Sequence, residues 1–274
     1  MFSVNTNVGA MIALENLNAT SAQLQKAQQV VSTGLAVGSA QDNGAIWAIA
    51  QNERATAASL DAVKTSLQTG QSILDVANSA GSTVSDLLTQ MKEKALAASD
   101  TSLDANSRAA LNTDFIALRN QITSTVTNAD FNGVNVLNGS LSQITSLANA
   151  AGTSVLTTLA QTLTLGSPIV TVAATASIGT VTLASAAILS VGASLTNVDN
   201  ALATLGTSAT ALQTHLTFVT NLQDTLNAGI GNLVNADLAK ESATLQALQT
   251  KQQLGIQALS IANSSSSALL GLFR

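Results

Sequence analysis

Apolar residues recur at seven-residue spacing in the last part of the chain, from Leu238 to Arg274. This stretch contains no proline, so nothing in it removes a backbone donor from a helix. A heptad repeat of apolar residues is typical of a helix that buries one narrow seam against a partner helix. We therefore predict a long paired helix whose seam has two tracks, Leu238, Leu245 and Leu259, and Leu248, Ala262 and Leu269.

A matching heptad track near the N-terminus provides the predicted partner. Its positions are Ala10, Leu17, Leu24 and Val31. Asn5 or Thr6 can cap the start of this helix by accepting a backbone N–H bond, and Gly34 can end it because glycine adopts the left-handed conformation at little cost. We predict that residues 1–33 and 236–274 form one domain of paired terminal helices.

Residues 34–50 have a different composition. Gly34 to Ala48 contains three glycines and the turn sequence Asp42-Asn43-Gly44. Glycine and Asn/Asp clusters favour turns and irregular backbone over regular elements. We predict an irregular, extended connector over 34–50.

Helical periodicity returns in the middle of the chain. Apolar spacing predicts helices over Gln51–Ser99, Leu103–Asn128 and Leu189–Leu226, with a capping break at Asp100–Asp104 between the first two. Gly229 and Gly231 are predicted to separate the third of these helices from the C-terminal helix. The terminal and middle helices together predict a chain that folds back on itself.

The sequence between the middle helices predicts β-structure. Two Asn-Gly pairs lie between Phe131 and Ser140, a strong signal for a hairpin. Residues 141–187 alternate Thr, Ser, Ala and Val around several glycines, which favours short strands and loops. The predicted fold is mainly α, a long antiparallel helical bundle or coiled coil built from both termini, with a small β-hairpin and a strand-rich insert. We predict a helical bundle with its hairpin over 51–140 and 189–231, and a variable, outward-facing insert over 141–188.

The charge content narrows the class of partner. Charged residues make up only 9% of the chain, the net charge is -5 and the isoelectric point is about 4.6. Nucleic-acid binding requires clustered Lys and Arg that neutralise phosphates, and the few basic residues here are scattered. We predict no nucleic-acid partner.

Two observations argue against a membrane segment and a secretory signal. The most apolar run, around residues 181–191, is short and contains Ser and Thr, so we predict no membrane insertion. The N-terminus has no basic region, and Glu15 interrupts its apolar stretch, which predicts a route other than a cleaved secretory signal.

The chain offers few residues for catalysis or metal binding. It has no cysteine, and its one histidine, His215, lies between helical apolar positions, so a structural role is favoured over a metal site. The sequence from Asp42 resembles the start of a calcium loop, but no Glu completes it, and Gly229-Ile230-Gly231 lacks the third glycine of a dinucleotide fingerprint. Trp47 is interpreted as a packing residue within or between subunits, with ligand stacking as the alternative. We predict no enzyme activity, no cofactor and no metal.

The two ends of the chain resemble a known family. Residues 4–50, which begin VNTNVGAMIALENL, resemble the flagellin N-terminal signature, and residues 237–273, which begin DLAKESATLQALQ, resemble the flagellin C-terminal signature. Three internal segments resemble short alphaproteobacterial flagellins in particular: KALAASDTSLD, FNGVNVLNG and THLTFVTNLQDTLNAGIGNLVNADLAKESA. The resemblance covers nearly all of the chain outside residues 141–190.

This resemblance implies a structural subunit of the extracellular bacterial flagellar filament, exported unfolded by the flagellar type III apparatus and assembled into a helical tube for swimming. It implies that the paired terminal helices line the inner tube, that the connector acts as a spoke and that the middle helices form the outer tube. The implied partners are further copies of the chain in a homopolymer, other flagellin paralogues, junction and cap proteins, and the export apparatus or a chaperone. The alternative is a hook-filament junction protein, which would share the terminal helices.

The predicted assembly interface combines the apolar seam with the tryptophan of the connector. Burial of several large side chains against neighbouring subunits would offset the entropy of ordering helices that are marginal alone. The residues predicted to form this interface are Leu17, Leu24, Val31, Trp47, Leu238, Leu245, Leu248, Leu259 and Leu269.

Overall fold

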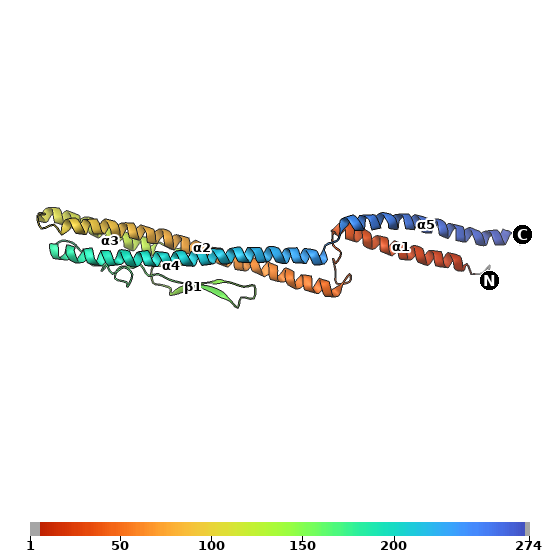
Figure 1. Ribbon diagram of the computed structural model, residues 1–274, viewed down its shortest axis with the longest axis horizontal. Helices are drawn as coiled ribbons and strands as arrows, with labels where there is room; N and C mark the ends of the chain where they lie inside the picture. The colour runs from red at the N-terminus through yellow and green to blue at the C-terminus, as the bar shows by residue number, and fades with distance from the viewer. Residues whose placement is uncertain (1–5, 272–274) are drawn as a thin grey trace. The chain divides into compact units, whose positions relative to one another are not determined.

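The structure, a computed structural model, describes residues 6–271 and the side chains of residues 6–264. The chain is mainly helical, as predicted, and separates into two compact units (Figure 1). The first unit contains the chain up to residue 55 and from residue 225, and the second contains residues 56–224. The elements in order are α1 (Val8–Thr33), α2 (Gly44–Ala98), α3 (Ala105–Thr127), β1 (Gln143–Leu147), β2 (Val155–Leu159), α4 (Val181–Val234) and α5 (Leu238–Gly271).

In the first unit, α1 and α5 lie side by side as an antiparallel pair (Figure 1). The pairing predicted from the two heptad tracks is confirmed. The cap of α1 differs from the prediction, because the side chain of Asn7, not Thr6, accepts a hydrogen bond from the N–H of Ala10 at 3.0 Å, and Asn5 lies outside the described residues. Gly34 ends α1 as predicted, with a φ of 72° and its N–H bonded to the carbonyl of Val30.

The connector between α1 and α2 is shorter than predicted. Asn43 accepts a bond from the N–H of Ile46 through its side chain and from Trp47 through its carbonyl, so α2 begins at Gly44 and the last part of the predicted connector is helical. On the other side of this unit, α4 continues to Val234, so the predicted break at Gly229 and Gly231 is wrong. The helix tolerates both glycines because neighbouring residues supply its packing.

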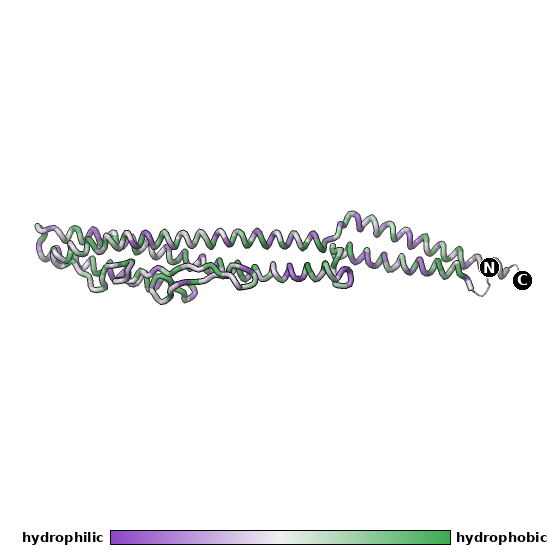
Figure 2. Tube along the Cα trace, turned by 60° about the horizontal axis from the view of Figure 1, so that its bottom comes forward, coloured by the Kyte–Doolittle hydropathy of each residue, from purple (hydrophilic) through white to green (hydrophobic). Residues whose placement is uncertain are grey.

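In the second unit, α2 and α4 run antiparallel. The amide of Gln223 donates to the carbonyl of Ala57 at 3.0 Å, and near the other end of the pair the hydroxyl of Ser85 donates to Asp199 at 3.4 Å. Figure 2 shows hydrophobic positions recurring between hydrophilic ones along each helix, as one buried stripe requires. The largest fully buried side chains of this unit come from its helices and insert: Leu60, Leu67, Leu74, Leu88, Met91, Phe115, Ile122, Leu137, Leu163, Ile178, Leu205 and Leu212.

The turn between α2 and α3 confirms the predicted capping break. Asp104 is the N-cap of α3 and accepts bonds from the Ser107 hydroxyl at 2.6 Å and from the N–H groups of Asn106 and Ser107. The Ser107 hydroxyl and these N–H groups hold the pKa of Asp104 below its usual 3.8. Arg108 closes the turn by donating to the carbonyls of Ala98, Asp100 and Leu103.

We expect the stability of this turn to depend on pH. Because the pKa of Asp104 is lower in the folded chain than in the unfolded chain, its contribution is present above the unfolded pKa and is lost as pH falls through the folded value. The variant Asp104→Asn keeps a side-chain oxygen that can cap α3, but this amide does not titrate. Its melting temperature should therefore fall less than that of the unmodified chain between about pH 5 and pH 3. An equal fall in both proteins would contradict this role.

The hairpin predicted at Phe131–Ser140 is only a tight turn. Phe131 and Val134 form a single antiparallel bridge around Asn132 and Gly133, which have φ values of 53° and 77°. The two Asn-Gly signals thus mark turns and not a strand pair. The two-stranded antiparallel sheet is β1 with β2, inside the region predicted to contain short strands.

The insert is packed against the helices. The N–H of Ile178 donates to the side-chain oxygen of Asn112 on α3 at 2.7 Å, and the N–H of Thr171 donates to the Ser194 hydroxyl on α4 at 2.9 Å. The side chains of Leu163, Val170, Val172 and Ile178 are fully buried. Thr180 then caps α4 by accepting from Leu183, so α4 begins at Val181, earlier than the predicted Leu189.

The β1–β2 hairpin is held on both long helices of the second unit. The N–H of Leu147 donates to the Ser66 hydroxyl on α2 at 3.0 Å, and the Ala148 carbonyl lies 2.7 Å from Nε2 of His215 on α4. Gly70 of α2 allows this close approach, because a Cβ there would collide with the Ser146 hydroxyl.

Among the described helices, α4 has the length and apolar composition that could cross a membrane, and 28% of its most apolar 18-residue window is buried within the chain. Core helices of other proteins can share this length and composition, although such helices are mostly buried. The absence of membrane insertion stays a prediction.

Candidate assembly surfaces

The seam between α1 and α5 is built from small and medium side chains of α1. Thr20, Leu24 and Ala27 are buried there, with exposed fractions of 4%, 8% and 5%. The Thr20 hydroxyl donates to the carbonyl of Asn16 in its own helix, which satisfies its donor. These residues allow close approach of α5 but bury little apolar area.

Polar contacts set the register of the two helices. Near the N-terminus of α1, the amide of Asn7 donates to the carbonyl of Ala262 at 2.8 Å. Further along, the amide of Gln252 donates to the Ser21 hydroxyl at 3.3 Å. Hydrogen bonds in a narrow seam are satisfied in only one register, which makes them determinants of pairing.

Gly255 and Gln252 appear in the sequence as interruptions of the heptad tracks, but both are contact residues. A Cβ at position 255 would lie 3.2 Å from Cδ1 of Leu17, so the glycine provides the space for this leucine. Sequence reasoning missed their roles because each is polar or small where a leucine is expected.

The structure places the other predicted interface residues at different depths. Leu17, Val31, Leu245, Leu248 and Leu259 are half-buried in the single chain. Leu238 is exposed at 48%, and the side chain of Leu269 lies outside the described residues. Their role between subunits stays a prediction.

One part of the seam is open. A groove of about 310 Å³ lies where α1 and α5 approach the connector. Ala27, Val30 and Leu248 give it an apolar floor, and Lys26 and Glu241 contribute opposite charges. The single chain therefore leaves apolar surface of this seam accessible.

A second apolar stripe on α5 was not predicted. Leu254 and Ile261 are exposed at 59% and 70%, and their spacing of seven residues places them on one face. They lie on the opposite side of the helix from Gln252, which faces α1. Exposed small residues at heptad-compatible positions extend the stripe: Ala243, Ala247, Thr250 and Ala258. The signal was present in the sequence, but it lay outside the two leucine tracks that define the seam.

The start of α1 carries exposed apolar side chains as well. They are Val8, Met11, Ile12 and Leu14, with exposed fractions between 48% and 65%. Contiguous exposed apolar residues on a pair of helices mark a surface for association with other protein.

Trp47 packs inside its own unit. Its partly buried ring lies against a small core of Val37, Ala50, Ile230 and Val234. Backbone bonds from the N–H groups of Ala36 and Val37 to the carbonyl of Val234 hold the connector against the end of α4. The structure thus gives Trp47 a packing contact within the chain, and its predicted contact between subunits is untested.

Asp42 organises the connector turn. Its carboxylate accepts bonds from the hydroxyl and N–H of Ser39 and from the N–H of Gly38 and lies 3.7 Å from the Nζ of Lys26. The Ser39 hydroxyl, the two N–H groups and Lys26 hold the pKa of Asp42 below its usual value. The sequence from Asp42 is therefore a turn that anchors the connector to α1.

Within the described residues, no three His, Asp or Glu side chains lie together as metal ligands would. His215 contacts the Ala148 carbonyl, and its ring centroid lies 5.7 Å from that of Phe218. These contacts give His215 a structural role. The exposed apolar faces of α1 and α5 remain the main candidate surface.

Two family models match the helical parts of this chain. The model of the bacterial flagellin N-terminal helical region matches residues 4–142, and that of the bacterial flagellin C-terminal helical region matches residues 188–273. The unmatched residues between them include β1, β2 and the packed loop that follows.

Individual relatives agree with the family models. Flagellin FljN of Caulobacter vibrioides is 61% identical over 272 residues, which cover 99% of this chain and 98% of that protein. A flagellin of Brucella melitensis is 34% identical over 283 residues, covering all of both chains. The crystal structure of Bacillus cereus flagellin aligns with a TM-score of 0.51 at 19% identity, covering 56% of this chain and 88% of that one, which supports the fold.

Proposed function

Since this chain belongs to the bacterial flagellin family and is thus a structural subunit of the flagellar filament, we propose that it joins the filament through the exposed apolar faces of α1 and α5. The observation that carries the proposal is the second stripe of α5, with Leu254 and Ile261 exposed on the face turned away from α1. In the filament, the seam would bind α1 to α5 within a subunit, and the stripe would contact neighbouring subunits.

Open helical polymers grow by heterologous contacts, in which one patch of a subunit meets a different patch on the next. A helix pair with apolar residues on several faces fits this requirement, because each face can contact a different neighbour. The predicted seam residues Leu17, Leu24 and Val31 would then order the pair, while α5 would supply the contacts that propagate it. We propose that this pair forms the inner tube and that the second unit forms the outer tube.

The weak pairing of α1 with α5 also suits export of an unfolded chain. The seam is narrow and interrupted by polar residues, so α1 and α5 gain little stability from each other and should be unpaired in the exported monomer. The proposed route is the flagellar type III apparatus, and the proposed location is the extracellular filament. Other flagellin paralogues, cap and junction proteins and an export chaperone are the proposed partners.

The flagellin family is structural, and we propose that this chain has no enzyme activity. The relatives described above are all named as flagellins, and none of the comparisons favours the hook-filament junction alternative.

The stripe can be tested by placing a charge in it. Leu254→Asp should raise the lowest concentration at which purified chain polymerises by about tenfold or more, since burial of a leucine contributes about 1.5–3 kcal/mol. The matched control is Gln253→Asp, which adds the same charge at an exposed neighbour on a different side of α5. The measurement is sedimentation of filaments over a concentration series. An equal effect of both variants would show that the stripe is not specifically buried.

A further inference from the structure

The second unit contains a long stretch that is almost free of charge. Between Asp130 and Asp224, the only Asp, Glu, Lys or Arg is Asp199. This stretch includes β1, β2, the packed loop and the part of α4 that belongs to the second unit. Charged residues are depleted at the centre of protein interfaces, because burying them costs desolvation free energy.

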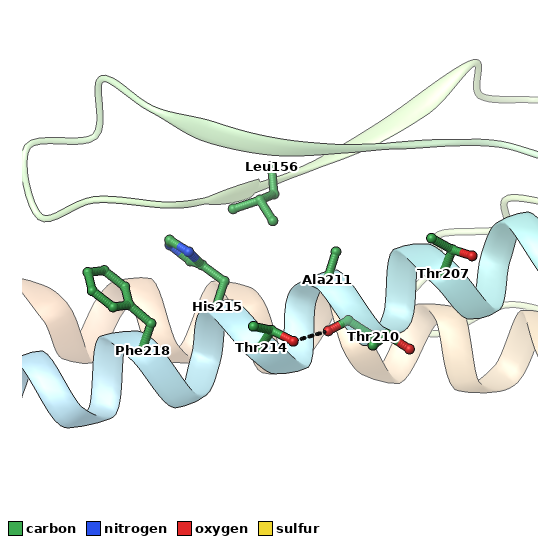
Figure 3. Close-up of a pocket in the computed structure, with 7 residues that line it drawn as sticks. All are labelled: Leu156, Thr207, Thr210, Ala211, Thr214, His215 and Phe218. Atoms are coloured by element: carbon green, nitrogen blue, oxygen red, sulfur yellow. Dashed lines mark hydrogen bonds between the residues drawn. The ribbon is translucent and has the colours of Figure 1, made fainter.

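A groove of about 570 Å³ lies in this stretch, between β2 and α4 (Figure 3). Leu156 of β2 points toward α4 across the groove (Figure 3). The α4 side consists of residues at helical spacing along one face: Thr207, Thr210, Ala211, Thr214, His215 and Phe218. All of these residues belong to the second unit.

The polar groups of the groove are already satisfied within the chain. The hydroxyls of Thr207, Thr210 and Thr214 donate to the carbonyls four residues earlier in α4, at 2.9, 3.0 and 2.8 Å. His215 is engaged by the Ala148 carbonyl. The threonines therefore offer their methyl groups as contact surface. Burial of the groove by a partner would leave none of these hydrogen-bond donors unpaired.

Phe218 is an exposed aromatic residue at one end of the groove. Its side chain is exposed at 56%, whereas Phe115 of the same unit is fully buried. Aromatic side chains at the centre of an interface carry much of its binding free energy. In a chain with 2% aromatic residues, an exposed phenylalanine beside an uncharged groove is a candidate contact residue.

We propose that this groove is an interface between subunits, occupied by the uncharged residues 131–198 of a neighbouring copy, and this proposal rests on the filament function above. An uncharged groove offers no attraction to nucleic acid or to charged peptides, but it is complementary to another uncharged apolar surface. The same stretch supplies such a surface, with Val155, Leu159 and Leu189 exposed at 50%, 59% and 76%. Apart from Leu156, the groove is lined by residues of α4 from Thr207 to Phe218, outside residues 131–198. The two contact surfaces are therefore different patches, as a heterologous contact requires.

The first test places a charge in the groove of the full-length chain. Phe218→Asp should raise the concentration needed for polymerisation at least tenfold, while Gln213→Asp, an exposed residue on a different side of α4, should leave it within about twofold. Both variants should keep the helical circular dichroism of the unmodified chain. Equal polymerisation of the two variants would overturn the interface.

A photocrosslinker tests the occupant directly. Benzoylphenylalanine in place of Phe218 should give crosslinks between copies in filaments and none in the monomer, with adducts mapping to residues 131–198 of the other copy. Adducts confined to the same chain, or to other regions of the neighbour, would overturn the proposal. If the unmodified chain formed no filaments at all, the proposed filament function would be wrong. If Phe218→Asp formed normal filaments, only the proposed groove interface would be wrong.

Discussion

Removal of Gln257–Arg274 is expected to abolish polymerisation while leaving the second unit folded. The deletion takes the last part of α5, including Leu259 of the seam and Ile261 of the exposed stripe, and the Ala262 carbonyl that binds Asn7. What remains of α5 keeps fewer contacts with α1, and most helical stability in proteins comes from such packing. The core of the second unit uses no residue beyond 224, so its fold should not depend on α5.

Electron microscopy and sedimentation of the concentrated truncated chain should show no filaments. Limited proteolysis should still yield a resistant fragment close to residues 56–224, and circular dichroism should show that most helix is retained. The matched control is Gln253→Asp, which is expected to assemble with all of α5 present. Filaments of normal length from the truncated chain would refute the role of α5, and loss of the resistant fragment would refute the independence of the second unit.

The helices could be predicted from the sequence because each carries a strong apolar period. The two heptad tracks predicted that α1 and α5 pair, and Gly34 marked the end of α1 through its left-handed conformation. The Asp100–Asp104 segment marked the turn before α3, since Asp104 can only cap a helix that begins after it. In these places local chemistry and tertiary packing favour the same structure.

The errors occurred where tertiary contacts decide the structure. Gly229 and Gly231 lie within α4, where Ile230 and Val234 pack against Val37 of the connector and outweigh the low helix propensity of glycine. The Asn-Gly pairs after Phe131 form turns whose neighbours bond to the later loop, as the Val136 and Leu137 carbonyls do, and so no strand pair forms there.

The candidate surfaces were predicted only in part. The seam leucines followed from spacing, but the exposed stripe of α5 and the groove at Phe218 required knowledge of which side of each helix is already covered. His215 shows the same limit, because its contact with the Ala148 carbonyl depends on where the β1–β2 hairpin lies. Periodicity identifies an apolar face, but it does not say whether the chain or another copy covers it.

Phe115→Ala is expected to cause the largest loss of stability among single substitutions in the second unit. Phe115 of α3 is fully buried, and truncation of a buried phenylalanine costs about 3–5 kcal/mol through lost burial and the cavity that remains. For a unit of this size, such a loss lowers the melting temperature by about 10 °C. Thermal unfolding followed by circular dichroism, or calorimetry of the monomer, measures this shift.

Phe218→Ala is the matched control, since it removes the same atoms from a side chain that is already 56% exposed. Its melting temperature should stay within about 3 °C of the unmodified chain, because surface substitutions cost little. The two variants should therefore separate folding from assembly: Phe115→Ala destabilises the monomer, and Phe218→Ala weakens polymerisation of a stable monomer. Equal losses of stability would mean that Phe218 belongs to the core of the unit, and the groove would then be a defect of packing instead of a contact surface.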